Sequence, residues 1–155
     1  MDSKLGRPLS LLGAMAGGME IKFPVEFTVL GTPVSFQAKR AASKEQWKAR
    51  VRAASTTAIP QPHFVSDERI AVTLYYLPEE RVEGDVDNIV KLVLDALCKH
   101  IYLDDAQVER VVVQKFEPGN VFDFRGPSAA MVDALNGAKP ALYVRVSNDP
   151  FEDLR

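Results

Sequence analysis

Four stretches of the chain are at least half hydrophobic, and in the first of them, residues 25–30, hydrophobic and polar residues alternate. These stretches are rich in β-branched and aromatic residues, which favour strands. Glycine or proline follows the first two of them, as expected where a strand ends. The pattern therefore predicts four β-strands, at residues 25–30 (VEFTVL), 69–77 (RIAVTLYYL), 107–116 (QVERVVVQKF) and 141–146 (ALYVRV).

A helical spacing of apolar residues follows the first predicted strand. Ser43 is placed to cap a helix that runs to about Thr57, with Trp47, Val51 and Ala54 on its inner face. Prolines shortly after this segment end the helix.

A second helix is predicted from Ile89 to about Lys99, and it is apolar over most of its surface. At about 100° per residue, its polar residues fall within a stripe about 80° wide. A helix that lies on one sheet needs a single apolar face, so this one has apolar surface left over. That surplus can meet the first helix or the same helix of another copy. The polar stripe consists of Asn88, Lys91, Asp95 and Lys99.

Residues 117–140 form an excursion between the last two predicted strands. It is punctuated by glycine and proline and is expected to hold a short helix, with Ser128 as its cap and Gly137 at its end. The main elements follow in the order β-α-β-α-β-β. This order predicts an α/β (α+β) fold, a single domain in which helices pack on one mixed β-sheet.

The composition supports one folded domain. Of 155 residues, 46% are hydrophobic, which is enough for a core. We expect a flexible leader at residues 1–20, the domain at residues 21–148 and a tail at residues 149–155. The leader contains a short apolar run that partly resembles a signal peptide, but its glycines interrupt the run and favour an unstructured segment.

The cysteine count, the length of the apolar runs and the net charge narrow the class of protein. The chain has one cysteine, Cys98, so it has no internal disulfide framework, and a cytoplasmic location is expected. No apolar run approaches the roughly 18 residues of a membrane span, so no membrane association is expected. The net charge of −2 neither indicates nor excludes nucleic acid as a partner, because a local basic face can attract a polyanion.

Two carboxylates, Asp85 and Asp87, stand directly before the apolar second helix. In an extended segment, side chains two residues apart point the same way, so both acids would face one spot. A divalent cation relieves their repulsion, and hard oxygen ligands suit Mg²⁺ or Mn²⁺. The alternative is a turn in which Asp87 or Asn88 caps the helix.

A second acidic pair, Asp104 and Asp105, precedes the third predicted strand. A helix of about 11 residues carries the chain about 16 Å from Asp87, and about five extended residues bring it back by the same distance. Either acid can therefore join the first pair if the connection runs back along the helix. Alternatively, this pair lies in a solvated turn.

The two acidic segments together resemble the signature of the RusA family of Holliday-junction resolvases. GDVDNIVKLVLDAL and YLDDAQV contain the pattern D-x-D-N, a lysine three residues after the asparagine, D-A-L, and then D-D-x-Q-V. The specific motif spans Asp85 to Val108, and the wider resemblance spans about Ile21 to Val146.

The resemblance implies a homodimeric, Mg²⁺-dependent endonuclease that nicks four-way DNA junctions in recombination and repair, without a nucleotide cofactor. Asp85, Asp87 and Asp105 match the family's metal-binding acids, with Asp104 as a further candidate ligand, and Lys91 matches its catalytic lysine. Asn88 and Asp95 are expected to support Lys91. The alternative is a RusA-like dimer that lacks turnover and acts as a DNA-binding or protein-interaction module.

The segment 39–52 holds six basic residues and one acidic residue, a local charge of +5. Such a stripe usually makes a helix soluble, but beside a nuclease motif it is a candidate surface for DNA phosphates. The chain departs from the RusA pattern just before the first aspartate. Members of that family tend to carry a strongly basic stretch there, whereas residues 79–84 of this chain are net acidic. The predicted DNA-binding residues are Lys39, Arg40, Lys44, Lys48, Arg52 and Arg81.

Overall fold

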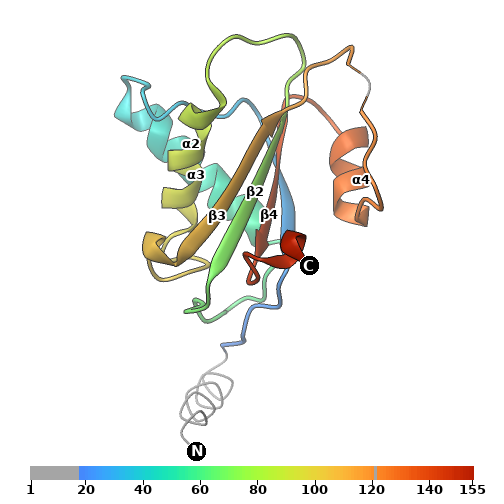
Figure 1. Cartoon of the computed structure of the whole chain (residues 1–155). Coiled ribbons are helices and arrows are strands. Elements are labelled where there is room, and N and C mark those ends of the chain that lie inside the picture. The colour runs from blue at the N-terminus through green and yellow to red at the C-terminus, as the bar shows by residue number, and fades with distance from the viewer. Residues whose placement is uncertain (1–17, 121) are drawn as a thin grey trace, which may run out of the picture.

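Four strands form one mixed sheet in the order β1-β4-β2-β3 (Figure 1). The computed structural model describes residues 18–120 and 122–155, so most of the expected leader lies outside the described residues. The β1–β4 and β4–β2 pairs are antiparallel, whereas β2 and β3 are parallel. All four predicted strands are confirmed, with bounds β1 Val25–Leu30, β2 Ile70–Leu77, β3 Val108–Lys115 and β4 Ala141–Ser147.

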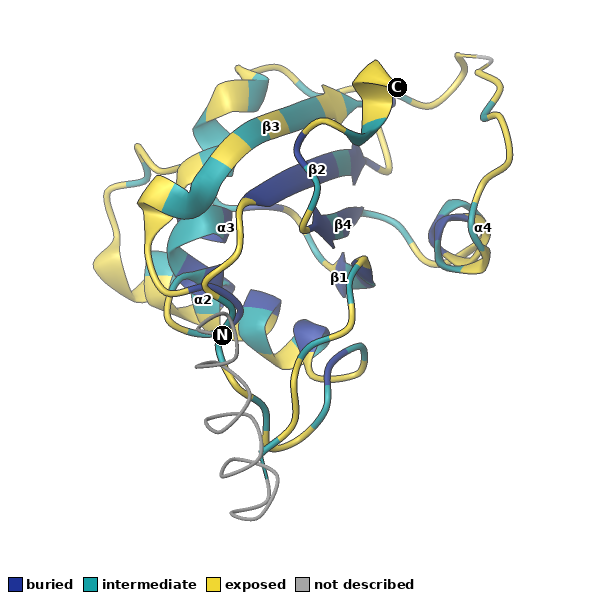
Figure 2. Ribbon diagram, turned by 60° about the horizontal axis from the view of Figure 1, so that its bottom comes forward, coloured by how far each residue is buried: buried dark blue, intermediate teal, exposed yellow. Residues whose placement is uncertain are grey.

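Helices α2 (Ala41–Ser55) and α3 (Val90–Leu97) pack on one face of the sheet and against each other. Trp47 and Val51 of α2 are buried, as predicted. Part of the surplus apolar surface of α3 meets α2, the first of the two partners that its sequence allowed, while Val90 and Leu94 stay half-buried. The central strands β2 and β4 are buried along nearly their whole length (Figure 2).

The excursion holds helix α4 (Ala129–Asn136), as predicted, and packs on the other face of the sheet. Ser128 caps this helix by accepting a hydrogen bond from the Met131 N–H at 3.1 Å. The Ser128 and Tyr143 hydroxyls both donate to the Glu26 carboxylate, which ties α4 to β1 and β4. Burial and the neighbouring Glu26 carboxylate raise the pKa of the Tyr143 hydroxyl, so it stays a donor.

The starts of α2 and α3 differ from the prediction. Helix α2 begins two residues before Ser43, with an extended Arg40 as its N-cap residue and no side-chain cap, so the predicted Ser43 cap is wrong. The N-terminus of α2 is exposed, and water can satisfy its free N–H groups. Before α3 the chain first forms a 3₁₀ turn, η2 (Val86–Ile89), and α3 ends at Leu97 because Cys98 is extended.

None of the helices within residues 18–120 and 122–155 has the length and apolar character needed to cross a bilayer.

We expect Leu97→Ala to lower the free energy of unfolding by about 2–5 kcal/mol, because it leaves a cavity between α3 and the sheet. Leu97 is 0% exposed. Leu103 is 49% exposed, so Leu103→Ala is the matched control and should cost less than about 1 kcal/mol. Urea unfolding followed by circular dichroism measures both. Equal losses would contradict the assignment of α3 to the core.

Candidate active site

The parallel pairing of β2 and β3 requires the connection between them to cross from one end of the sheet to the other. The connection contains a loop, η2, α3 and a short 3₁₀ turn, η3 (Asp105–Gln107). The first acidic pair therefore lies where α3 begins, and the second pair lies where β3 begins (Figure 1).

Asp85 and Asp87 do not share one extended segment. Asp85 is extended (φ −88°, ψ 134°) and is the N-cap residue of η2, whereas Asp87 lies within this turn. The predicted extended geometry is therefore wrong, because the helical turns begin one residue after Asp85. Both acids are exposed, and neither carboxylate has a hydrogen bond or ion pair with another described residue. They remain free to bind a cation.

The end of β3 holds the loop that leads to Asp85. The Val82 N–H donates to Glu117 Oε2 at 2.8 Å, and Lys115 Nζ donates to the Val82 carbonyl at 3.0 Å. Gly84 then has a φ of +115°, a conformation that side chains disfavour, which lets the chain turn into Asp85. Lys115 and Glu117 therefore fix the approach to the first acidic pair. Sequence reasoning missed both, because their partner is a backbone segment 33–35 residues away.

Lys91 connects the helix to the second acidic pair. Its Nζ lies 2.6 Å from Asp95 Oδ1 and 3.7 Å from Asp105 Oδ2. The hydrogen bond to Asp95 is the main cause of a raised pKa for the Lys91 ammonium. The charges of Asp95 and Asp105 add to it, and partial burial opposes it. The expected contact of Asp95 with Lys91 is present, and the lysine is held as a cation.

Gln107 is a site residue that sequence reasoning did not single out. Its side-chain oxygen accepts from the N–H groups of Leu103 and Asp104, both at 2.8 Å. Its side-chain nitrogen donates to the carbonyls of Ser66 and Glu68. A neutral amide can do both because it carries a donor and an acceptor. The glutamine of D-D-x-Q-V therefore fastens the acidic turn to the segment before β2.

The connection after α3 is not the extended one that was predicted, because the chain turns at residues 99–101, where Lys99 has a φ of 63°. Asp105 nevertheless lies within reach of the Lys91 side chain. Within residues 18–120 and 122–155, however, no three carboxylate, imidazole or thiolate groups lie close enough together to hold one metal ion. The meeting of Asp105 with Asp85 and Asp87 therefore stays a prediction, as does a ligand role for Asp104. By chemistry the donor set fits Mg²⁺, since all these groups are exposed carboxylates.

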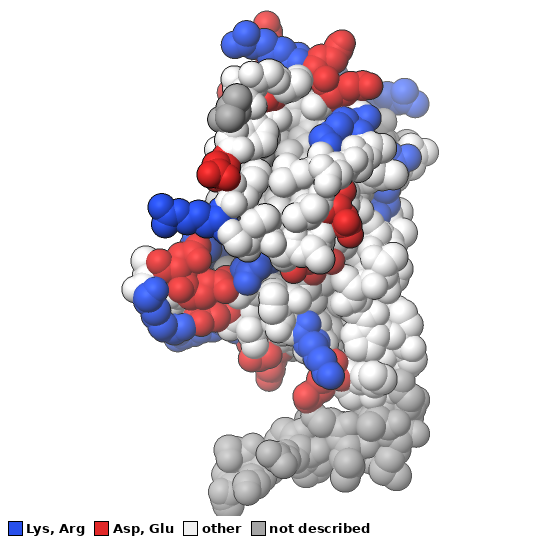
Figure 3. All heavy atoms as spheres, turned by 90° about the vertical axis from the view of Figure 1, so that its right-hand side faces the viewer, with Lys and Arg blue, Asp and Glu red and all other residues white. Residues whose placement is uncertain are grey.

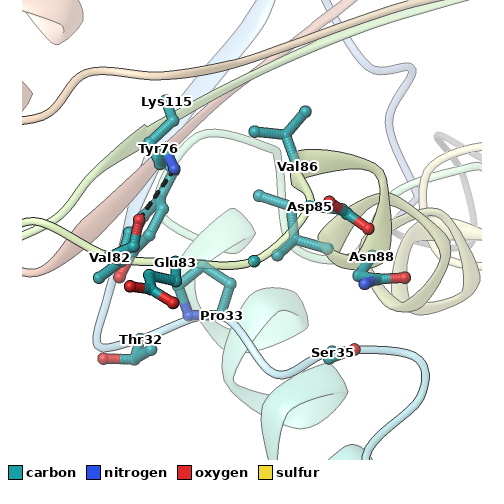
Figure 4. Close-up of a pocket in the computed structure, with 12 residues that line it drawn as sticks. Thr32, Pro33, Ser35, Tyr76, Val82, Glu83, Asp85, Val86, Asn88 and Lys115 are labelled. Atoms are coloured by element: carbon teal, nitrogen blue, oxygen red, sulfur yellow. Dashed lines mark hydrogen bonds between the residues drawn. The ribbon is translucent and has the colours of Figure 1, made fainter.

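A pocket of about 310 Å³ opens beside Asp85. Figure 4 shows Asp85 and Asn88 on one side of it and Thr32, Glu83 and Lys115 on the other. Asn88 lines this pocket, and its backbone carbonyl accepts from the Phe36 N–H at 2.9 Å. The loop after β1 thus forms one wall of the site.

The predicted DNA-binding residues of α2 and its approach are available at the surface. Lys39 and Arg40 are exposed, and Lys44 lies over the Phe36 ring at 5.1 Å. Lys48 pairs with Glu45 at 2.8 Å and Arg52 is half-buried, which leaves them less free. Arg81 is almost fully exposed in the loop before Asp85. On the side that carries α4, acidic and basic side chains are mixed (Figure 3).

Comparison with family models gives a match to the endodeoxyribonuclease RusA over residues 31–122, more than half of the chain. The matched region contains Lys91, both acidic pairs and Gln107. No curated protein matches the chain.

We expect Gln107→Ala to speed amide hydrogen exchange at Asp104 by about tenfold or more, because that N–H loses its acceptor. Gln107→Glu keeps the acceptor for the Asp104 N–H but loses the donor to the Ser66 and Glu68 carbonyls. Hydrogen exchange should therefore speed up more near Ser66 and Glu68 than at Asp104. Gln114→Ala, an exposed glutamine on β3, is the control. Unchanged exchange at Asp104 in Gln107→Ala would show that the side chain does not hold this turn.

We expect Asp95→Asn to lower the pKa of Lys91 towards its ordinary value of 10.5, and Asp105→Asn to lower it less. The lysine pKa is raised in the folded state, so the stabilisation from this charge is complete below pH 10.5 and is lost as pH rises through the folded value. NMR titration of the Lys91 ammonium measures the shift. A larger effect of Asp105→Asn would reverse the ranking of the two partners.

Proposed function

The chain belongs to the RusA family of endodeoxyribonucleases, and we propose that it resolves four-way (Holliday) DNA junctions by metal-dependent hydrolysis in recombination and repair. The observation that carries the proposal is the contact of Lys91 with Asp105 at 3.7 Å. This contact brings the lysine of the first motif segment to an acid of the second segment.

Asp85, Asp87 and Asp105 would hold Mg²⁺, with Mn²⁺ as a possible replacement. The ion would supply a water of lowered pKa and a Lewis acid for the phosphate. Lys91 places a positive charge beside Asp105, where it can stabilise negative charge that develops on the phosphate. Asp95 is a positioning residue that holds the lysine in this orientation. Asn88 lines the adjacent pocket, and its backbone carbonyl binds the loop after β1; its expected support of Lys91 stays a prediction.

The DNA would approach along the basic residues before and on α2. Lysines and arginines that contact phosphates position a duplex without reading its bases. This suits an enzyme that recognises a branched shape. The proposed DNA-binding set is Lys39, Arg40, Lys44, Lys48, Arg52 and Arg81, with the first two and Arg81 the most exposed.

We propose a homodimer as the active form. A junction is resolved by two nicks on opposing strands, and a symmetric dimer supplies two copies of one site. The nuclease domain would span residues 21–148, flanked by the leader and the tail.

A non-catalytic RusA-like module is the second candidate. One observation favours it: the described carboxylates do not form a group of three that could hold one ion. Such a module would bind branched DNA or protein and leave the DNA intact.

We expect Asp85→Asn and Asp105→Asn to lower the rate of junction cleavage by about 10²-fold or more, the scale for losing one group that stabilises developing charge. Junction binding should persist, because neither change removes a basic residue. Synthetic four-way and linear duplex DNA, incubated with Mg²⁺, Mn²⁺ or EDTA, measure cleavage, and a gel-shift measures binding.

Asp133→Asn, on the exposed surface of α4, is the matched control and should cut the junction at the unsubstituted rate. Cleavage that survives EDTA, or undiminished cleavage by either site variant, would refute the assignment. Junction binding without cleavage by the unsubstituted protein would favour the non-catalytic module.

A further inference from the structure

The pocket beside Asp85 has an apolar interior. Pro33, Tyr76, Val82, Val86 and Ile89 line it, and Tyr76 is 7% exposed. Burial raises the pKa of the Tyr76 hydroxyl, so it remains protonated at neutral pH. A volume of about 310 Å³ lies at the lower end for small-ligand sites, so the pocket can enclose one ring system.

The side-chain charges at the pocket disfavour a phosphate in its interior. The carboxylates of Glu83 and Asp85 lie on its lining. The one basic residue there, Lys115, already donates to the Val82 carbonyl at 3.0 Å and lies 3.8 Å from Glu117. A phosphate would meet two negative groups and one engaged cation. A neutral group with apolar faces and a polar edge fits better.

We infer that this pocket receives one unpaired nucleobase of the branched substrate, from a nucleotide next to the cleaved phosphate. The inference rests on the proposed function. A base has flat apolar faces for the interior and hydrogen-bonding groups on its edge. Acceptors and donors for that edge are present in Glu83, Asn88, Thr32 and Ser35.

The position of the pocket supports this occupant. Asp85 and Asn88 belong both to the acidic motif and to the pocket lining, so a base inside leaves its own phosphate near the proposed metal ligands. Extruding a base costs least where it is already unpaired, and the branch point of a junction is where pairing is most easily lost. Entry of the base would thus couple branch recognition to placement of the phosphate.

The test combines a modified substrate with a filled pocket. Four-way junctions carry an abasic site at each nucleotide beside the cleaved bond in turn, and Thr32→Trp and Ser35→Phe fill the pocket from its rim. One abasic position should slow the unsubstituted protein about tenfold or more, the scale of one lost base contact. The filled variants should cleave the intact junction slowly, and that abasic site should not lower their cleavage rate further.

Thr57→Trp, exposed beyond α2, is the control and should respond to the abasic site as the unsubstituted protein does. Cleavage that is insensitive to every abasic position overturns the inference but leaves the proposed function intact. The same holds if the abasic site lowers the cleavage rate of the filled variants as much as that of the unsubstituted protein. Light scattering of the filled variants identifies a third case, in which a second copy occupies the pocket and filling it dissociates a dimer; this also overturns the inference.

A binding measurement covers the case in which no junction is cut. 2-Aminopurine at the sensitive position, or at each flanking position in turn, reports unstacking when the protein binds in EDTA. A fluorescence change with the unsubstituted protein that is absent with Thr32→Trp supports base entry even without turnover. No change with either protein overturns it.

Discussion

The parallel pairing of β2 with β3 is the constraint on which the rest of the structure depends. Parallel neighbours need a crossover, and here the crossover contains α3, whose apolar surface is buried between the sheet and α2. A rigid helix therefore separates the acids that precede it from those that follow it. This geometry shapes the candidate site, because α3 carries the chain from the end of β2 back to the start of β3 and so places the two acidic pairs at opposite ends of the crossover.

Lys91 links the helix to the acids that follow it. A long side chain with a terminal charge can reach groups that the backbone keeps apart, and its ammonium contacts acids from α3 and from η3. Each acidic segment has its own support, with Glu117 and Lys115 holding the loop before Asp85 and Gln107 holding the turn at Asp104. The site is thus held by β3 at both of the strand's ends.

Local sequence patterns were sufficient for the elements and for the family. The strands, the buried face of α2 and the Ser128 cap all follow from residues within one turn or one strand of each other. The Ser43 cap and the direction of Asp87 were wrong, since each depends on which residue starts a helix, and several starts satisfy the same pattern. The role of Gln107 joins segments about 40 residues apart, and no local pattern encodes that distance.

The place of β4 in the sheet has a consequence for biosynthesis. Among the described strands, β1 has its ladder with β4, and β4 also pairs with β2. Although β1 leaves the ribosome first, it must wait for residues 141–147 before it can join the others. Until then the backbone N–H and C=O groups of β1 and of one edge of β2 stay unpaired, so the nascent chain is most vulnerable to misassembly just before β4 emerges.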